Sequence, residues 1–203
     1  MPNSKARNLR QFRSAQVAFE TRSSETGPVI AGYFAVFNNP TELWPGCIEQ
    51  IAPGAFSSSL GGDVRALIDH DTRLVIGRTV AGTLTLREDA TGLYGEIKIN
   101  EQDSDAMNLY ARVQRGDVSQ CSFGFDIIAE DYVVSQDGQT CTWTVRDLVL
   151  YEVSVVTFPA YEATNVEARA DGSAPSIKTS RMERRKNDLK ERIKRINEDS
   201  HSA

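Results

Sequence analysis

The sequence predicts a mainly β protein with helices, of the α+β class. Between residues 15 and 156, most of the chain consists of short runs in which β-branched and aromatic residues alternate with polar ones. Turn-forming residues separate these runs, and one segment, residues 104–116, repeats its apolar residues at helical spacing instead. A chain of 203 residues is long enough for one well-buried domain plus tails. We therefore expect a single β-rich core.

The first half of the chain predicts an arm, several strands and one short helix. Residues 1–14 are polar and basic without periodicity, which is typical of a loose arm. Residues 38–45 have the composition of a loop, and Pro53 stands where a short helix over residues 54–60 could begin. Alternation predicts strands at residues 15–22, 29–37, 47–52, 64–70, 74–78, 82–87 and 92–99.

The second half contains the clearest helix, followed by a long hairpin. Over residues 104–116, Ser104 can cap the helix and Gly116 can end it. Residues 118–134 predict a central strand or a pair of strands, and the turn signal SQDGQ at 135–139 follows. Residues 140–156 are rich in β-branched side chains and predict the returning strand.

The C-terminal part of the sequence differs from the body at residues 15–170. Residues 171–180 have the composition of a linker. Residues 178–198 contain nine Lys or Arg against four Asp or Glu, and Leu189, Ile193 and Ile196 lie at helical spacing. We expect a basic amphipathic helical tail over residues 181–203, which serves packaging or self-assembly.

Composition excludes several classes of function. The net charge of -5 gives no sign of general affinity for nucleic acid, and no apolar run approaches the length of a membrane span. The N-terminus lacks the apolar core of a signal peptide, so we expect a cytoplasmic protein. Three cysteines at no metal-like spacing and two histidines predict neither a metal site nor a cofactor. We expect Cys47, Cys121 and Cys141 to be reduced, small buried side chains.

The run VSQCSFGF at residues 118–125 carries the candidate nucleophile, Ser122. Gly124, two residues later, would let another backbone or a substrate approach closely, although it could equally be a packing glycine between two core phenylalanines. Cys121 is an alternative nucleophile, but alternation places it on the opposite face of the strand from Ser122.

His70 is the candidate base because it is the only histidine in the body of the protein. A serine hydroxyl needs a base that works near neutral pH, and imidazole suits that role. His70 also falls at the end of a predicted strand, where a rigid scaffold can present it. His201 lies in the polar tail and is set aside.

Glu152 is the candidate third member, since a carboxylate within so apolar a strand is costly to bury unless it is paired. It could orient His70 and stabilise the imidazolium, as in acyl transfer by a serine nucleophile. Its alternatives are a surface position or pairing with an arginine. Asp69, Asp71 and Asp126 are rival carboxylates, with Asp71 second to Glu152.

Several motifs in this order resemble the prohead serine proteases of tailed phages, of the HK97 type. The resemblance covers about residues 16–168, and the coincidence of many motifs makes it specific. The motifs are GYFAVFNNP at 32–40, IAPGAFSSSL at 51–60, VRALIDHD and IGRT within 64–79, GTLTLRED and GLYGEI within 82–97, CSFGFDI at 121–127 and LYEVSVVTFPAY at 150–161.

This resemblance implies a herpesvirus protease-like fold, an antiparallel β-barrel surrounded by a few helices. It places the catalytic histidine, serine and acidic residue on His70, Ser122 and Glu152, without a cofactor. It implies a serine endopeptidase in the assembling prohead, within the host cytoplasm, which cleaves the major capsid protein's scaffolding segment or a scaffold protein, and also itself. The oligomeric state, a homo-oligomer included, stays open. The alternatives are a non-enzymatic scaffold or capsid-associated binding protein, and a hydrolase of small esters.

Overall fold

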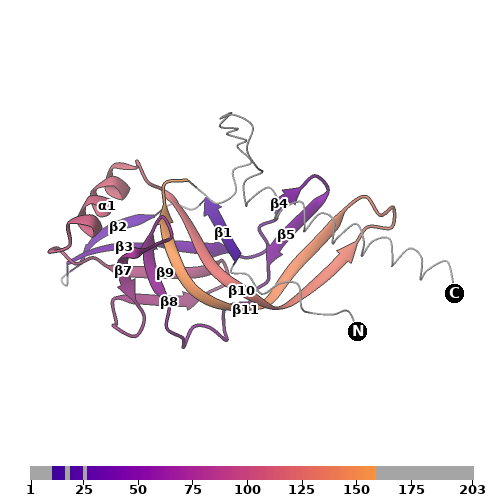
Figure 1. The fold of residues 1–203 in the computed structure, drawn as a ribbon, viewed down its shortest axis with the longest axis horizontal. Coiled ribbons are helices and arrows are strands. Elements are labelled where there is room, and N and C mark those ends of the chain that lie inside the picture. The colour runs from indigo at the N-terminus through magenta and orange to yellow at the C-terminus, as the bar shows by residue number, and fades with distance from the viewer. Residues whose placement is uncertain (1–10, 17–18, 25–26, 159–203) are drawn as a thin grey trace, which may run out of the picture.

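The structure of this protein is a computed structural model that describes residues 11–16, 19–24 and 27–158. These residues form eleven strands and one helix (Figure 1). The strands are β1 (Gln11–Gln16), β2 (Glu20–Ser24), β3 (Gly27–Val36), β4 (Thr41–Trp44), β5 (Cys47–Ile51), β6 (Arg65–Ile68), β7 (Asp71–Arg78), β8 (Leu84–Glu88), β9 (Gly92–Lys98), β10 (Gln120–Val134) and β11 (Cys141–Val156), and the helix is α1 (Ser104–Arg115).

The larger sheet is built around the long antiparallel pair β10 and β11, which curves across the whole molecule in Figure 1. On its other side, β11 pairs in parallel with β5 near its start and with β6 near its end. The first residues of β10 lie between β11 and β1, because β1 pairs antiparallel with residues 120–125. Three strands therefore meet around Ser122, and one of them, β1, comes from a distant part of the sequence.

The smaller sheet has the strand order β2-β3-β9-β8. One main apolar core includes residues from both sheets and from α1. Phe123 is part of this core and is 2% exposed, and Phe56 contacts it edge to face. Because side chains alternate along a strand, Ser122 and Gly124 lie on the face of β10 opposite Phe123. The core thus fixes the strand that carries the candidate nucleophile.

The mainly β prediction is confirmed, but the closed barrel is not. The described strands form two sheets whose pairing does not close into a ring, and the described residues contain one helix instead of several. No described helix has the length and hydropathy that crossing a membrane requires. The predicted linker and basic tail lie outside the described residues.

Most predicted strands are present, and the differences have local causes. Residues 53–60 form consecutive turns instead of a helix, and β4 lies within the predicted loop at 38–45. Asp103, not Ser104, caps α1, because its side chain accepts hydrogen bonds from the backbone N–H groups of Asp105 and Ala106. Gly116 ends the helix in the left-handed conformation, as expected. β1 begins within the predicted N-terminal arm, at Gln11.

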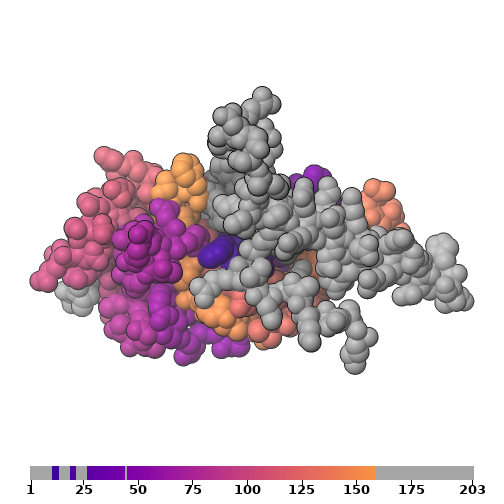
Figure 2. Space-filling model, viewed as in Figure 1, coloured from indigo at the N-terminus to yellow at the C-terminus, as the bar shows by residue number. Residues whose placement is uncertain are grey.

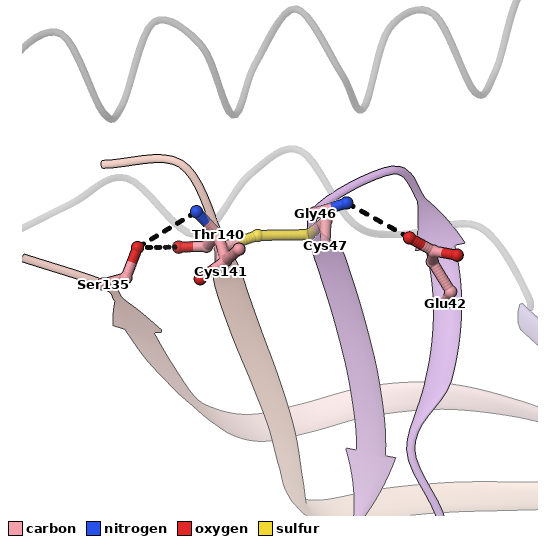
Figure 3. The surroundings of a disulfide bond; sticks show 6 residues. All are labelled: Glu42, Gly46, Cys47, Ser135, Thr140 and Cys141. Atoms are coloured by element: carbon pink, nitrogen blue, oxygen red, sulfur yellow. Dashed lines mark hydrogen bonds between the residues drawn. A yellow bond between two sulfur atoms is a disulfide. The ribbon is translucent and has the colours of Figure 1, made fainter. Parts of the chain in front are cut away.

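The cysteine prediction is wrong for two of the three residues. Cys47 and Cys141 are opposite one another where β5 and β11 begin to pair, and a disulfide joins them (Figure 3). With Leu43 and Trp143 they form a second, small apolar cluster. The two residues are 94 positions apart, so alternation alone could not show that they meet. Cys121 is free and buried, as predicted.

Candidate active site

His70 lies in the turn between β6 and β7, and the backbone there is held in an unusual conformation. Asp69 and His70 have φ values of 48° and 61°, in the left-handed region that few residues other than glycine adopt. The Asp69 carboxylate accepts a hydrogen bond of 2.7 Å from the backbone N–H of Thr157, just beyond β11. The Asp69 N–H also donates to the Val155 carbonyl. These contacts attach the turn that carries His70 to the end of β11.

The imidazole of His70 contacts the carboxylate of Glu152. His70 Nδ1 lies 2.7 Å from Glu152 Oε1, and the side chains are 23% and 5% exposed. An ionised carboxylate can only accept, so Nδ1 carries the proton in this pair. This fixes the tautomer and leaves Nε2 as the nitrogen that can accept a proton. His70 Nε2 is buried and has no hydrogen-bond partner among the described residues.

A second hydrogen bond holds the Glu152 carboxylate from the other side. The Ser154 hydroxyl donates to Glu152 Oε2 at 2.6 Å, and Ser154 is fully buried. Glu152 and Ser154 are two residues apart on β11 and share a face. Both carboxylate oxygens are therefore occupied, which offsets the cost of burying the charge.

Gly124 makes room for this pair. It lies opposite Glu152 in the register of β10 and β11. A Cβ atom at Gly124 would come within 2.6 Å of Glu152 Oε1 and 3.1 Å of the Phe12 ring. The Phe12 ring in turn contacts His70 edge to face, with ring centroids 4.6 Å apart. The glycine is thus required for the approach of two side chains, instead of the backbone or substrate that the sequence suggested.

Ser122 lies on the same face of the sheet as Glu152, two residues before Gly124 on β10. It is opposite Ser154, as Gly124 is opposite Glu152. Its hydroxyl donates a hydrogen bond of 2.9 Å to the backbone carbonyl of Arg13 in β1, and Ser122 is fully buried. Within the described residues it makes no hydrogen bond to His70. The structure therefore brings His70 and Glu152 together and places Ser122 on their face, with its hydroxyl bonded to β1.

The rival residues lie elsewhere. Cys121 Sγ is 3.0 Å from the carbonyl oxygen of Tyr33, toward the second sheet. Asp71 pairs with the exposed Arg73, whose hydrogen bonds lower the pKa of Asp71 to about 2. Asp126 accepts a hydrogen bond from the Tyr151 hydroxyl. Among the candidate carboxylates, Glu152 is the one that contacts His70.

Three contributors to the site were not predicted. Ser154 could have been noticed, because the EVS sequence places it on the face of Glu152. The roles of Phe12 and Arg13 could not, because residues 1–14 show no periodicity and were assigned to an arm. Both reach the site only because β1 pairs with β10.

Over most of its length the chain is similar to known proteins. The family model of the caudovirus prohead serine protease matches residues 17–179. The chain is 33% identical over 144 residues to the prohead protease of Enterobacteria phage HK97. The aligned segment makes up 69% of this chain and 59% of that protein, so the chain matches little more than half of its relative's length. The solved structure of the bacteriophage T4 capsid assembly protease is similar over 74% of this chain and 98% of that one, with 11% identity and a TM-score of 0.49. On the family match and the HK97 relative, this chain belongs to the caudovirus prohead serine protease family.

Proposed function

We propose that this protein is a serine endopeptidase of the assembling prohead, with Ser122 as nucleophile, His70 as base and Glu152 as the residue that orients His70. One observation carries this assignment: the His70–Glu152 pair, at 2.7 Å, lies on the face of the sheet that bears Ser122. An alcohol, an imidazole and a buried carboxylate are the groups that acyl transfer by serine requires.

The proposed reaction assigns one step to each residue. The Ser122 hydroxyl turns from the Arg13 carbonyl toward His70, and its proton passes to Nε2 as Oγ attacks the substrate carbonyl. Glu152 stays ionised and stabilises the imidazolium. His70 then gives the proton to the departing amine, and water hydrolyses the acyl-enzyme. The state of Nε2 supports this role, because among the described residues it has no hydrogen-bond partner, and it is buried in a ring that contacts Phe12.

The proposed substrates are the scaffolding segment of the major capsid protein or a separate scaffold protein, and the protease itself. The support is the family membership together with the similarity to the HK97 prohead protease. The proposed place of action is the interior of the assembling prohead in the host cytoplasm.

The test is cleavage of the capsid precursor during co-expression with Ser122→Ala. Loss of a nucleophile that acts as part of a unit lowers kcat by roughly a million-fold, so no cleaved precursor should accumulate. The measurement is intact mass and N-terminal sequencing of the precursor. Cys121→Ala is the matched control, because it removes the neighbouring rival nucleophile and should leave cleavage intact. Cleavage by Ser122→Ala at the wild-type rate would remove Ser122 from the mechanism.

A further inference from the structure

The strand β1 pairs with the part of β10 that carries Ser122. It runs antiparallel to β10, with Ser14 opposite Ser122 and Phe12 opposite Gly124. The Ser122 hydroxyl is hydrogen-bonded to the Arg13 carbonyl, and the Phe12 ring covers His70. In the view of Figure 2, a small patch of indigo atoms from the N-terminal strands lies next to orange atoms of the C-terminal strand. Extended peptides commonly bind by adding a strand to a sheet in this way.

Arg13 is buried to a degree that is unusual for arginine at the edge of a sheet. It is 5% exposed, and its guanidinium forms a double hydrogen bond with the carboxylate of Glu49, one of them 2.8 Å from Nη2 to Oε2. The Cζ atom of Arg13 lies over the ring of Phe125, 5.6 Å from its centroid, and Nη1 donates a hydrogen bond to the Phe12 carbonyl. A buried ion pair of this kind favours a basic side chain at this position by its charge.

Glu49 is a buried carboxylate on β5. It is 2% exposed and lies between Cys47 and Ile51 on the buried face of β5. A carboxylate on such a face is stable only when a positive group pairs with it. The pairing residue comes from β1, 36 positions earlier in the chain. If β1 left the sheet, Glu49 would lose this ion pair, and a basic side chain of another strand could form it in the place of Arg13.

The hollow around this pair adjoins the site. Arg13 and Glu49 line it together with Phe123, the residue after Ser122. The family match begins at residue 17, so β1 lies before the matched segment. Glu49 is inside that segment, and Arg13, which forms an ion pair with it, is outside it.

We propose that β1 occupies the substrate position of the protease, and that Glu49 selects an arginine or lysine immediately before the bond that is cleaved. This rests on the proposed function. When a substrate replaces β1, Ser122 Oγ bonds to the carbonyl carbon of the basic residue, and its proton passes through His70 to the departing amine. Water then releases the basic residue with a free carboxylate and restores Ser122. Until β1 leaves, it blocks the site.

The first test uses the unmodified full-length protein and needs no variant. Four blocked peptides cover residues 8–18, all with Arg10→Gln, and carry Arg, Lys, Leu or Glu at the position of Arg13. The Arg and Lys peptides should be cut after that residue about 100-fold faster than the others, because only a basic side chain can replace the ion pair that Arg13 forms with Glu49. Equal rates for all four peptides would overturn the inference.

A charge exchange tests the role of Glu49 directly. The double variant Arg13→Glu with Glu49→Arg keeps an ion pair in place and should fold. Its preference should turn toward the Glu peptide, whereas a preference for Arg that persists would overturn the role of Glu49. Arg13→Ala should cut the Arg peptide faster than the wild type, because β1 is held less firmly. The matched control, Arg115→Ala, alters an exposed arginine and should leave the rate unchanged.

Labelling by a small fluorophosphonate separates failure of this inference from failure of the proposed function. The reagent reacts with an activated serine without using the Glu49 hollow. Labelled Ser122 together with no preference for basic peptides would overturn the inference and leave the protease assignment standing. No label on Ser122 in either the wild type or Arg13→Ala would overturn both.

Discussion

The carboxylate of Glu152 is held between two residues that come from different elements. His70 reaches it from the turn after β6, and Ser154 reaches it from within β11. Since both oxygens are bonded, the carboxylate cannot rotate without losing one partner. This fixes the imidazole plane and directs Nε2 away from Glu152, which a base in acyl transfer needs.

Gly124→Ala should reduce both activity and stability. The new Cβ would lie 2.6 Å from Glu152 Oε1, so the end of the glutamate side chain must move. Displacing a catalytic group by about 1 Å can cost about 100-fold in rate. Peptide cleavage should fall by at least that factor, as measured by kcat, and the melting temperature should fall as well, because the displaced buried carboxylate loses a hydrogen bond.

Gly61→Ala is the matched control for this substitution. A Cβ at Gly61 has no atom within 4 Å, so both rate and melting temperature should be unchanged. If Gly124→Ala retained the wild-type kcat, the position of Glu152 would not matter to the reaction.

At the scale of single residues, the sequence could show types and faces but not contacts. The need for an imidazole base led to His70, and the cost of a buried carboxylate led to Glu152. The structure shows these two in contact, and Ser122 on their face stays a proposal as nucleophile. The pairing of Arg13 with Glu49 could not be predicted, because it depends on the register of β1 against β10.

At the scale of secondary-structure elements, β11 connects the parts of the site. It carries Glu152 and Ser154, pairs with β10 along its length, and holds β5 and β6 in parallel at its two ends. It therefore connects the turn of His70 with the strand of Glu49. The disulfide between Cys47 and Cys141 attaches β5 to β11 at the end remote from His70.

Reduction of this disulfide should destabilise the protein. In the chain-entropy account, a crosslink across 94 positions raises the free energy of the unfolded chain by about 4.7 kcal/mol, and measured effects are commonly about 2–4 kcal/mol. The midpoint of urea unfolding should therefore fall when dithiothreitol is added, in the wild type and in Cys121→Ala.

The double variant Cys47→Ser with Cys141→Ser provides the control, since its midpoint should not respond to dithiothreitol. Three reactive thiols in the unfolded, unreduced wild type, instead of one, would contradict the disulfide.

At the scale of elements, strong periodicity was sufficient to predict a helix or a strand, whereas composition alone was not. The helix at residues 104–116 and the hairpin at 118–156 were visible because their patterns are long. The predicted helix after Pro53 failed, since Gly54 and three consecutive serines form turns more readily than a helix. The short strand β4 was missed because four residues carry too little alternation.

At the scale of the whole molecule, β1 pairs with the strand that carries Ser122 of the proposed triad. This strand, β1, precedes the segment that matches the family model. The sequence predicted the fold class and, by resemblance, the family. It did not predict that residues 11–16 would cover Ser122, because an unpatterned segment gives no sign of its partner. Ser122 is thus fully buried in this structure, and its hydroxyl is hydrogen-bonded to the Arg13 carbonyl of β1.

The most direct measurement of the central claim is the site of modification by a fluorophosphonate. After incubation of the full-length protein, mass spectrometry of its peptides should find one adduct, on Ser122, and His70→Ala should reduce its rate of formation strongly. That result is expected if Ser122 is activated by the His70–Glu152 pair. An adduct on another residue, or labelling of Ser122 at the same rate in His70→Ala, would contradict the account.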